Sequence, residues 1–158
     1  MKTSSDAPEA LLEVRDLSIG FRGDGGMHRA VDGVGFSVRP GEGIAVVGES
    51  GSGKSVTALS LAGLLPSPPA KVLSGEVMLS GRDTLRMSER QLRRIRGKEI
   101  AYIFQEPSSS LNPVFSIRSQ LGEVLKLHRP DISAAERDDE MVRWLYRVGI
   151  VDPEKRLR

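Results

Sequence analysis

Apolar and polar residues alternate in two stretches near the start of the chain, residues 17–21 and residues 34–38. A period of two is typical of strands that bury one face. Between the stretches lies the turn sequence Gly-Asp-Gly-Gly at 23–26, which favours a tight reversal. The pattern therefore predicts an antiparallel hairpin. The apolar positions of its two strands are Leu17, Ile19, Phe21, Val34, Phe36 and Val38.

A third apolar stretch, residues 44–47, is continuous, as in a short strand that is buried on both faces. Glycine-rich residues follow it directly. From Val56 to Gly63, apolar residues then recur at helical spacing. This order predicts a buried strand, a loop and a helix that begins near Gly53.

The rest of the chain predicts short strands and amphipathic helices. Residues 75–81 and 100–104 have strand patterns, and Gln-Glu-Pro at 105–107 ends the second. The residue pairs with the spacing of a helix-starting capping box are Ser88 with Gln91 and Ser133 with Glu136. One predicted helix carries Ile117, Leu121, Val124 and Leu125. The next has an apolar face that must be buried against something, formed by Met141, Trp144, Leu145 and Val148.

The glycine-rich loop has the pattern G-x-x-x-x-G-K-[ST], which is typical of a phosphate-binding P-loop. Its glycines allow backbone N–H groups to approach phosphate oxygens, and the start of the following helix adds positive potential there. Lys54 supplies a charge for the β- and γ-phosphates, and the Ser55 hydroxyl is a ligand type that Mg²⁺ accepts. The alternative is an ordinary glycine-rich turn. The residues expected to bind nucleotide are Gly48, Glu49, Ser50, Gly51, Ser52, Gly53, Lys54, Ser55 and Val56.

Composition adds mainly exclusions. The 158 residues include 39% hydrophobic and 28% charged residues, which describes a globular chain, and they suit one domain or a large part of one. The net charge of +2 and the absence of a binding motif around the basic residues 82–98 argue against nucleic-acid binding. There is no cysteine for a disulfide or thiolate metal site, and His28 and His128 stand alone. No apolar stretch has the roughly 18 residues of a membrane span, so any work at a membrane would go through a partner.

Four features together resemble one family. They are the strand 17–21 before the hairpin turn, the loop GESGSGKS, the segment FQEPSSSLNP at 104–113 and the closing VGIVDPEKRLR. The chain looks like the N-terminal part of an ABC transporter ATPase. Its segment FQEP followed by SLNP resembles the corresponding segment in the ATPases that drive importers of oligopeptides, dipeptides or nickel. The resemblance implies an α/β fold with an N-terminal antiparallel hairpin, an incomplete P-loop NTPase (RecA-like) core and the start of a helical subdomain. It suggests a flexible N-terminus over 1–10, the ATP-binding core over 11–107 and the helical region over 108–158.

The same resemblance assigns roles to individual residues. Phe21 matches the aromatic position that stacks on adenine, although it could simply be the last core residue of its strand. Gln105 matches the glutamine that reaches Mg²⁺ and the attacking water, so that Lys54 and Gln105 form the expected catalytic set. The alternative for Gln105 is that it is a polar residue that only ends a strand. The loop from Glu106 to Phe115 is the expected contact with the membrane-embedded permease subunits.

The implied ligands are ATP and Mg²⁺, and the further implied partners are a second ATPase subunit and, indirectly, a solute-binding protein. The implied location is the cytoplasm, peripheral on the inner face of the cell membrane. The sequence contains neither an LSGGQ signature nor an apolar strand that ends in Asp-Glu. We therefore expect a fragment that hydrolyses ATP poorly by itself and whose residues 44–47 have exposed edges and faces. The alternatives are a nucleotide-binding remnant without catalysis and a small-molecule P-loop kinase, against which the segment 104–113 and the hairpin argue.

Overall fold

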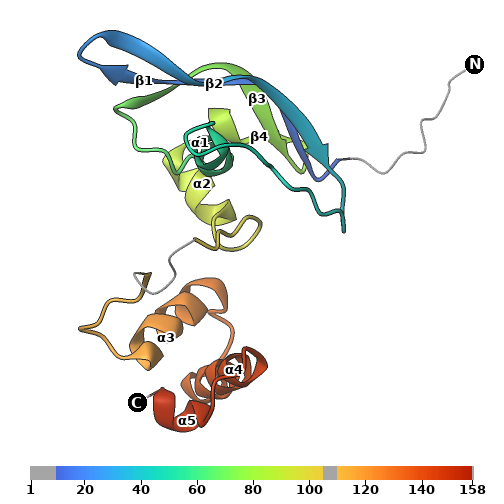
Figure 1. Ribbon diagram of the computed structural model, residues 1–158. Helices are drawn as coiled ribbons and strands as arrows, with labels where there is room; N and C mark the ends of the chain where they lie inside the picture. The colour runs from blue at the N-terminus through green and yellow to red at the C-terminus, as the bar shows by residue number, and fades with distance from the viewer. Residues whose placement is uncertain (1–9, 105–109, 158) are drawn as a thin grey trace, which may run out of the picture. The chain divides into compact units, whose positions relative to one another are not determined.

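The computed structural model describes residues 10–104 and 110–157. The chain forms two compact units, one up to Arg96 and the other from Gly97 onward (Figure 1). The expected flexible N-terminus falls almost wholly on residues 1–9, which lie outside the described part of the chain.

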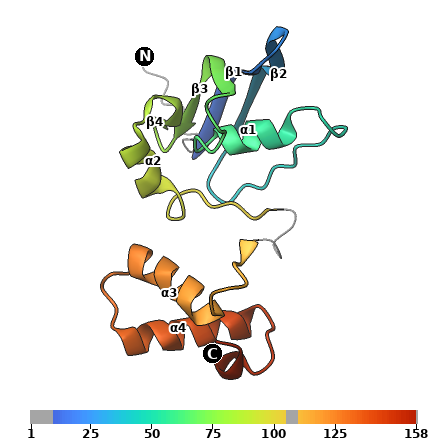
Figure 2. The same ribbon diagram turned by 90° about the vertical axis from the view of Figure 1, so that its left-hand side faces the viewer.

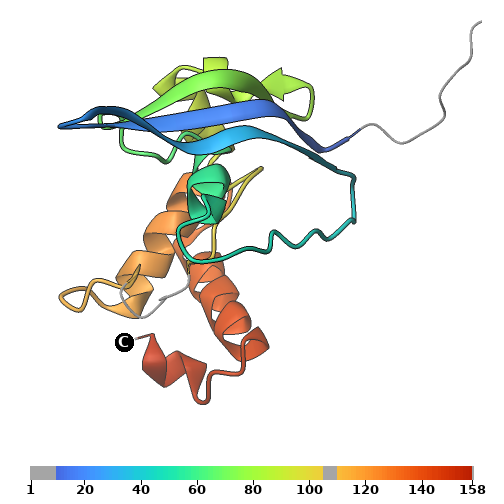
Figure 3. The same ribbon diagram turned by 45° about the horizontal axis from the view of Figure 1, so that its top comes forward.

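The first unit contains a four-stranded antiparallel sheet. Its strands are β1 (Leu12–Gly23), β2 (Gly26–Val38), β3 (Ala70–Leu79) and β4 (Arg82–Asp83), in the order β2-β1-β3-β4. Figure 3 shows β2, β1 and β3 side by side, twisting along their length. The predicted hairpin is confirmed, with Gly23 opposite Gly26 across the turn. The strand predicted at 75–81 is longer than expected, because β3 already pairs with β1 from Ala70 onward.

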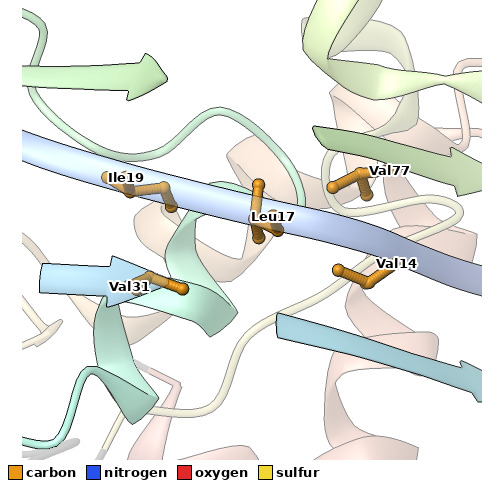
Figure 4. Packing of buried hydrophobic residues seen from close by; sticks show 5 residues of the cluster. All are labelled: Val14, Leu17, Ile19, Val31 and Val77. Atoms are coloured by element: carbon orange, nitrogen blue, oxygen red, sulfur yellow. The ribbon is translucent and has the colours of Figure 1, made fainter. Parts of the chain in front are cut away.

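The core of this unit lies on one face of the sheet. Figure 4 shows its central side chains, which are Val14, Leu17, Ile19, Val31 and Val77. The short helix α1 (Lys54–Ser60) and the residues after it cover this face through Val56, Leu61 and Leu65. The 3-10 turn η1 (Thr84–Arg86) leads to α2 (Glu89–Ile95), which lies on the same side of the sheet as α1 (Figure 2). β1 lies between two other strands, and its residues 17–20 are all buried, although their sequence pattern alternates.

Two strand predictions are wrong. Residues 42–49 have no regular structure, and the Val47 side chain is 89% exposed instead of buried on both faces. Residues 101–104 are equally irregular, with Ile103 98% exposed. A strand needs a neighbour that accepts and donates its ladder hydrogen bonds, and among the described residues no strand pairs with either segment. Residues 44–47 are exposed, as expected, but they do not form a strand.

The second unit is helical. It contains α3 (Ile117–His128), α4 (Ala134–Arg147) and α5 (Pro153–Arg156). The capping box at the start of α4 is confirmed: Ser133 Oγ accepts from Glu136 N at 3.3 Å, and Glu136 Oε2 accepts from Ser133 N at 2.7 Å. The capping box of Ser88 and Gln91 at the start of α2, in the first unit, is confirmed as well.

The predicted burial of the α4 face is only partly correct. Met141 is 3% exposed, but Trp144 is 51% and Val148 is 68% exposed. An exposed ion pair between Arg118 and Asp138 also links α4 to α3. Over the described ranges, none of the helices is both long and apolar enough to cross a membrane.

Candidate functional site

The glycine-rich loop leads from the exposed segment 42–47 into α1, which begins at Lys54 as predicted. Gly53 caps the helix with a φ of 88°, in the left-handed region that favours glycine. A methyl group on its α-carbon would lie only 2.5 Å from the carbonyl oxygen of Ala30. Ala30 lies in a bulge of β2, because Val31 pairs with Ile19 and the next pair on β1 uses Arg29. The hairpin thus fixes the end of the loop.

The side chain of Lys54 folds back into the loop. Its Nζ donates to the carbonyl oxygens of Gly48 at 2.7 Å and Glu49 at 2.6 Å, and lies 3.3 Å from Ser52 Oγ. Ser52 N in turn donates to the Glu49 carbonyl at 3.2 Å. These bonds close the loop around an ammonium group, while residues 48–52 remain exposed to solutes. An anion that bound to this exposed loop would take the place of the carbonyl oxygens that accept from Lys54 Nζ.

In the first turn of α1, two side chains anchor the helix and a third is exposed. Thr57 is buried, and both its N–H and its hydroxyl donate to the Gly53 carbonyl, at 2.8 and 3.0 Å. Val56 is half-buried against the sheet core. The Ser55 side chain is exposed, and no hydrogen bond within the described residues occupies its hydroxyl. Ser55 is therefore the group at this turn that can offer an oxygen to a ligand or cation.

Phe21 lies on β1 opposite His28 of β2 and Ala70 of β3. Its ring is half-buried and packs against the core cluster, which favours the simpler reading of Phe21 as a core residue. Phe21 is nevertheless two residues from Ile19, whose cross-strand partner Val31 contacts the Gly53 end of the loop. Stacking on a base by Phe21 stays a prediction.

Gln105 and the beginning of the predicted partner loop, 106–109, lie outside the described residues. The remainder of that loop, 110–115, exposes Val114 by 83% and Phe115 by 57%. Within the described ranges, acidic and histidine side chains nowhere gather in a group of three or more that could hold a metal ion.

Two residues that position these segments were missed by the sequence analysis. Gln120 of α3 accepts from Asn112 N at 2.9 Å and donates to the carbonyls of Asn112 and Phe115, both at 3.0 Å, so it holds the exposed loop onto the helix. Arg96 donates to the carbonyls of Ala62 and Gly63, which follow α1. No local sequence signal could have identified Arg96, because its partners lie more than thirty positions earlier in the chain. Asn112 and Gln120 are only eight residues apart, so their contact is short-range.

Residues 31–158 match a protein family described as ABC transporter. The chain is 50% identical over its full length to the peptidoglycan transport ATP-binding protein YejF of Agrobacterium fabrum, of which it covers 28%. It is 47% identical over 98% of its length to a probable peptide ABC transporter ATP-binding protein, y4tR, of Sinorhizobium fredii, and covers 46% of that protein. It is 46% identical over 93% of its length to the oligopeptide transport ATP-binding protein OppD of Bacillus subtilis, and covers 41% of it. The chain thus spans less than half the length of these relatives.

Solved structures agree on the fold. The dimeric bacterial ABC transporter cassette MJ0796 superimposes with a TM-score of 0.70 at 22% identity, over 85% of this chain and 57% of the cassette. CbiO1 of Clostridium perfringens, part of the ABC transporter complex cbiONQ, gives 0.66 at 22% identity, over 92% of this chain and 53% of that protein. The predicted α/β cassette fold is therefore confirmed. With a family match over most of its length and these relatives, the chain belongs to the ABC transporter family.

Proposed function

We propose that this chain binds ATP at residues 48–55 and forms part of the ATP-hydrolysing motor of an importer for peptides. The observation that carries the proposal is the closed loop around Lys54 Nζ, with two carbonyl contacts at 2.6 and 2.7 Å. The contacts place a positive charge within a solvent-exposed, glycine-rich loop, and a triphosphate would replace the carbonyl oxygens as acceptor from the ammonium group.

The proposed contacts follow from the donor set. The N–H groups of residues 48–53 and the ammonium of Lys54 bind the β- and γ-phosphates, and Val56 anchors the helix that begins at Lys54. The exposed Ser55 hydroxyl is suited to hold Mg²⁺, which supplies charge neutralisation of the phosphates when it is bound. We assign a second Mg²⁺ contact and orientation of the attacking water to Gln105, and contact with the adenine base to Phe21.

The proposed partners rest on exposed surface and on relatives. Residues 110–115 present Val114 and Phe115 to solvent while Gln120 holds their backbone in place. Such an anchored apolar loop is suited to packing against another protein, and we assign Glu106–Phe115 to the permease contact. The motor then acts on the cytoplasmic face of the membrane, as a pair with a second ATPase subunit and with a solute-binding protein as an indirect partner. The names of the relatives favour peptides over nickel as cargo.

Binding of a fluorescent ATP analogue to the full chain tests the proposal. We expect Lys54→Ala to weaken binding at least about tenfold, since it removes a charge-assisted contact worth about 1.5–3 kcal/mol. Lys71→Ala is the matched control, because Lys71 is an exposed lysine of β3 outside the loop, and it should leave affinity unchanged. Equal affinities for all three proteins would refute the site.

A phosphate-release assay distinguishes an ATP-hydrolysing motor from a module that binds nucleotide without cleaving it. The proposal for the isolated chain is binding with slow hydrolysis, because Lys54 and Ser55 hold the triphosphate while positioned water and full Mg²⁺ coordination set the rate. Turnover at ordinary ATPase rates that Lys54→Ala abolishes would contradict the slow hydrolysis, but not the binding site.

A further inference from the structure

A groove lies between α3 and α4 of the second unit, which run side by side (Figure 2). Its volume of about 360 Å³ is large enough for a small molecule, since ligand pockets typically have about 300–1,000 Å³. Gly122 of α3 and Ala134 of α4 line it, and a methyl group added to Gly122 would meet nothing within 4 Å. Met141, which is 3% exposed, gives the groove an apolar wall. The space over Gly122 is therefore open to a ligand.

The charged side chains that line this groove are mostly basic: Arg118, Lys126, Arg137 and Asp138. Arg118 and Asp138 form a two-pronged ion pair, in which Arg118 Nε donates to Asp138 Oδ1 at 2.9 Å and Nη2 donates to Oδ2. This pair neutralises one basic group with the one carboxylate of the groove. Lys126 and Arg137 therefore remain as two positive charges that no acidic side chain of the groove compensates.

Arg137 is half-buried. Its backbone N–H donates to the Ser133 carbonyl within α4, but across residues 10–104 and 110–157 no hydrogen bond or ion pair engages its guanidinium group. The Arg118 hydrogen bond is the main cause that lowers the pKa of the Asp138 carboxyl, and the charge of Arg137 contributes less. A guanidinium group that is partly withdrawn from water and lacks an acceptor favours an anion at its side of the groove.

We propose that the groove between α3 and α4 binds the phosphate group of a phosphate monoester. The two uncompensated charges match this group, which carries a charge of about −1.5 to −2 at neutral pH. The planar fork of Arg137 can donate to two phosphate oxygens, and the exposed Ser119 hydroxyl in the groove can donate to a third. The organic part of the ester then lies against Met141. All these residues belong to the second unit, so the proposal does not rest on the ATP site of the first.

Amide chemical shifts of the full chain test the proposal, in an NMR titration with glycerol 3-phosphate against sodium chloride at the same ionic strength. We expect the ester, and not the salt, to shift residues 116–126 and 134–141. Arg137→Gln should weaken binding at least about tenfold, because it removes a charge-assisted contact. The matched control is Arg143→Gln, which removes the same charge from an exposed arginine of α4 outside the groove and should leave the affinity unchanged. Lys54→Ala should leave it unchanged as well.

Gly122→Leu fills the groove without removing a charge, so it should abolish binding. Leucine is a better helix former than glycine, so this variant serves if Arg137→Gln fails to fold. Sedimentation of the chain with phosphatidylcholine vesicles, with and without phosphatidic acid, identifies the source of the phosphate. Sedimentation that requires phosphatidic acid and is lost in Gly122→Leu supports a lipid headgroup, and binding of glycerol 3-phosphate alone supports a soluble ester.

Unchanged binding in folded Arg137→Gln or in Gly122→Leu would overturn the proposal. Failure of both the soluble ester and the vesicles to bind at the groove would overturn it as well.

Discussion

Substitution of Gly53 tests how the hairpin fixes the phosphate loop. Gly53→Ala places a methyl group 2.5 Å from the Ala30 oxygen and 3.3 Å from Val31 Cγ2. It also requires alanine to adopt a φ of 88°. The left-handed conformation costs about 1–2 kcal/mol, and displacement of packed neighbours adds about 1–3 kcal/mol. We therefore expect a loss of about 2–5 kcal/mol in the free energy of unfolding of the first unit.

Gly51→Ala is the matched control, because Gly51 has a φ of 83° but an added methyl group would meet nothing within 4 Å. It should cost only the conformational term, about 1–2 kcal/mol. The difference between the two variants measures the contact with Ala30.

Urea unfolding followed by far-UV circular dichroism, together with hydrogen exchange of β1 and β2, reports on the first unit. The only tryptophan, Trp144, lies in the second unit, so its fluorescence is an internal control that neither substitution should affect. Losses that agree within about 0.5 kcal/mol, the limit within which surface substitutions normally fall, would show that the hairpin does not press on the loop.

Three further substitutions probe the two units, one in the first and two in the second. Leu17→Ala, at a fully buried side chain of β1, should cost about 2–5 kcal/mol in urea unfolding of the first unit, and retained stability would place the core elsewhere. The Arg118 guanidinium lowers the pKa of the Asp138 carboxyl, chiefly through their hydrogen bond. The pair therefore contributes stability above the ordinary pKa of an aspartate, about 3.9, and loses it as the pH falls through the depressed pKa. Asp138→Asn should remove that part of the acid sensitivity of the Trp144 signal, and an unchanged acid profile would contradict this assignment. Ser133→Ala should cost about 1 kcal/mol through loss of the cap on α4, measured by thermal circular dichroism, and an unchanged melting curve would show that the capping box is not needed.

Features that depend on neighbours within a few residues could be predicted from the sequence. The turn at 23–26, the capping box of Ser133 and Glu136, and the start of α1 all appear where the pattern places them. Each is decided by local backbone conformation or by a side chain that bonds three positions away. The bonds from Lys54 to the carbonyls of Gly48 and Glu49 are also local, over six and five residues, but the sequence pattern did not predict them.

Features that depend on distant partners could not be predicted. The apolar runs 44–47 and 100–104 are suited to burial, but an apolar run does not specify what covers it. Trp144 likewise belongs to an amphipathic face, yet half of it is exposed and its ring contacts Arg147 and Glu140 of its own helix. Periodicity identifies a face that can be buried and leaves its neighbour undetermined.

The proposed site likewise combines features set by neighbouring residues with features set by distant residues. Substitutions in the two groups should have different effects. Its shape is local, since Lys54 is held by residues 48–52. Its placement is not local, since the Ala30 carbonyl leaves no room for a side chain at Gly53, before α1, and Arg96 bonds to the carbonyls that follow α1. Changes in the loop should therefore alter affinity for the triphosphate directly, because they remove ligand contacts. Changes at Arg96 should instead alter the stability of the first unit, because that residue bonds to the carbonyls that follow α1 and not to the loop.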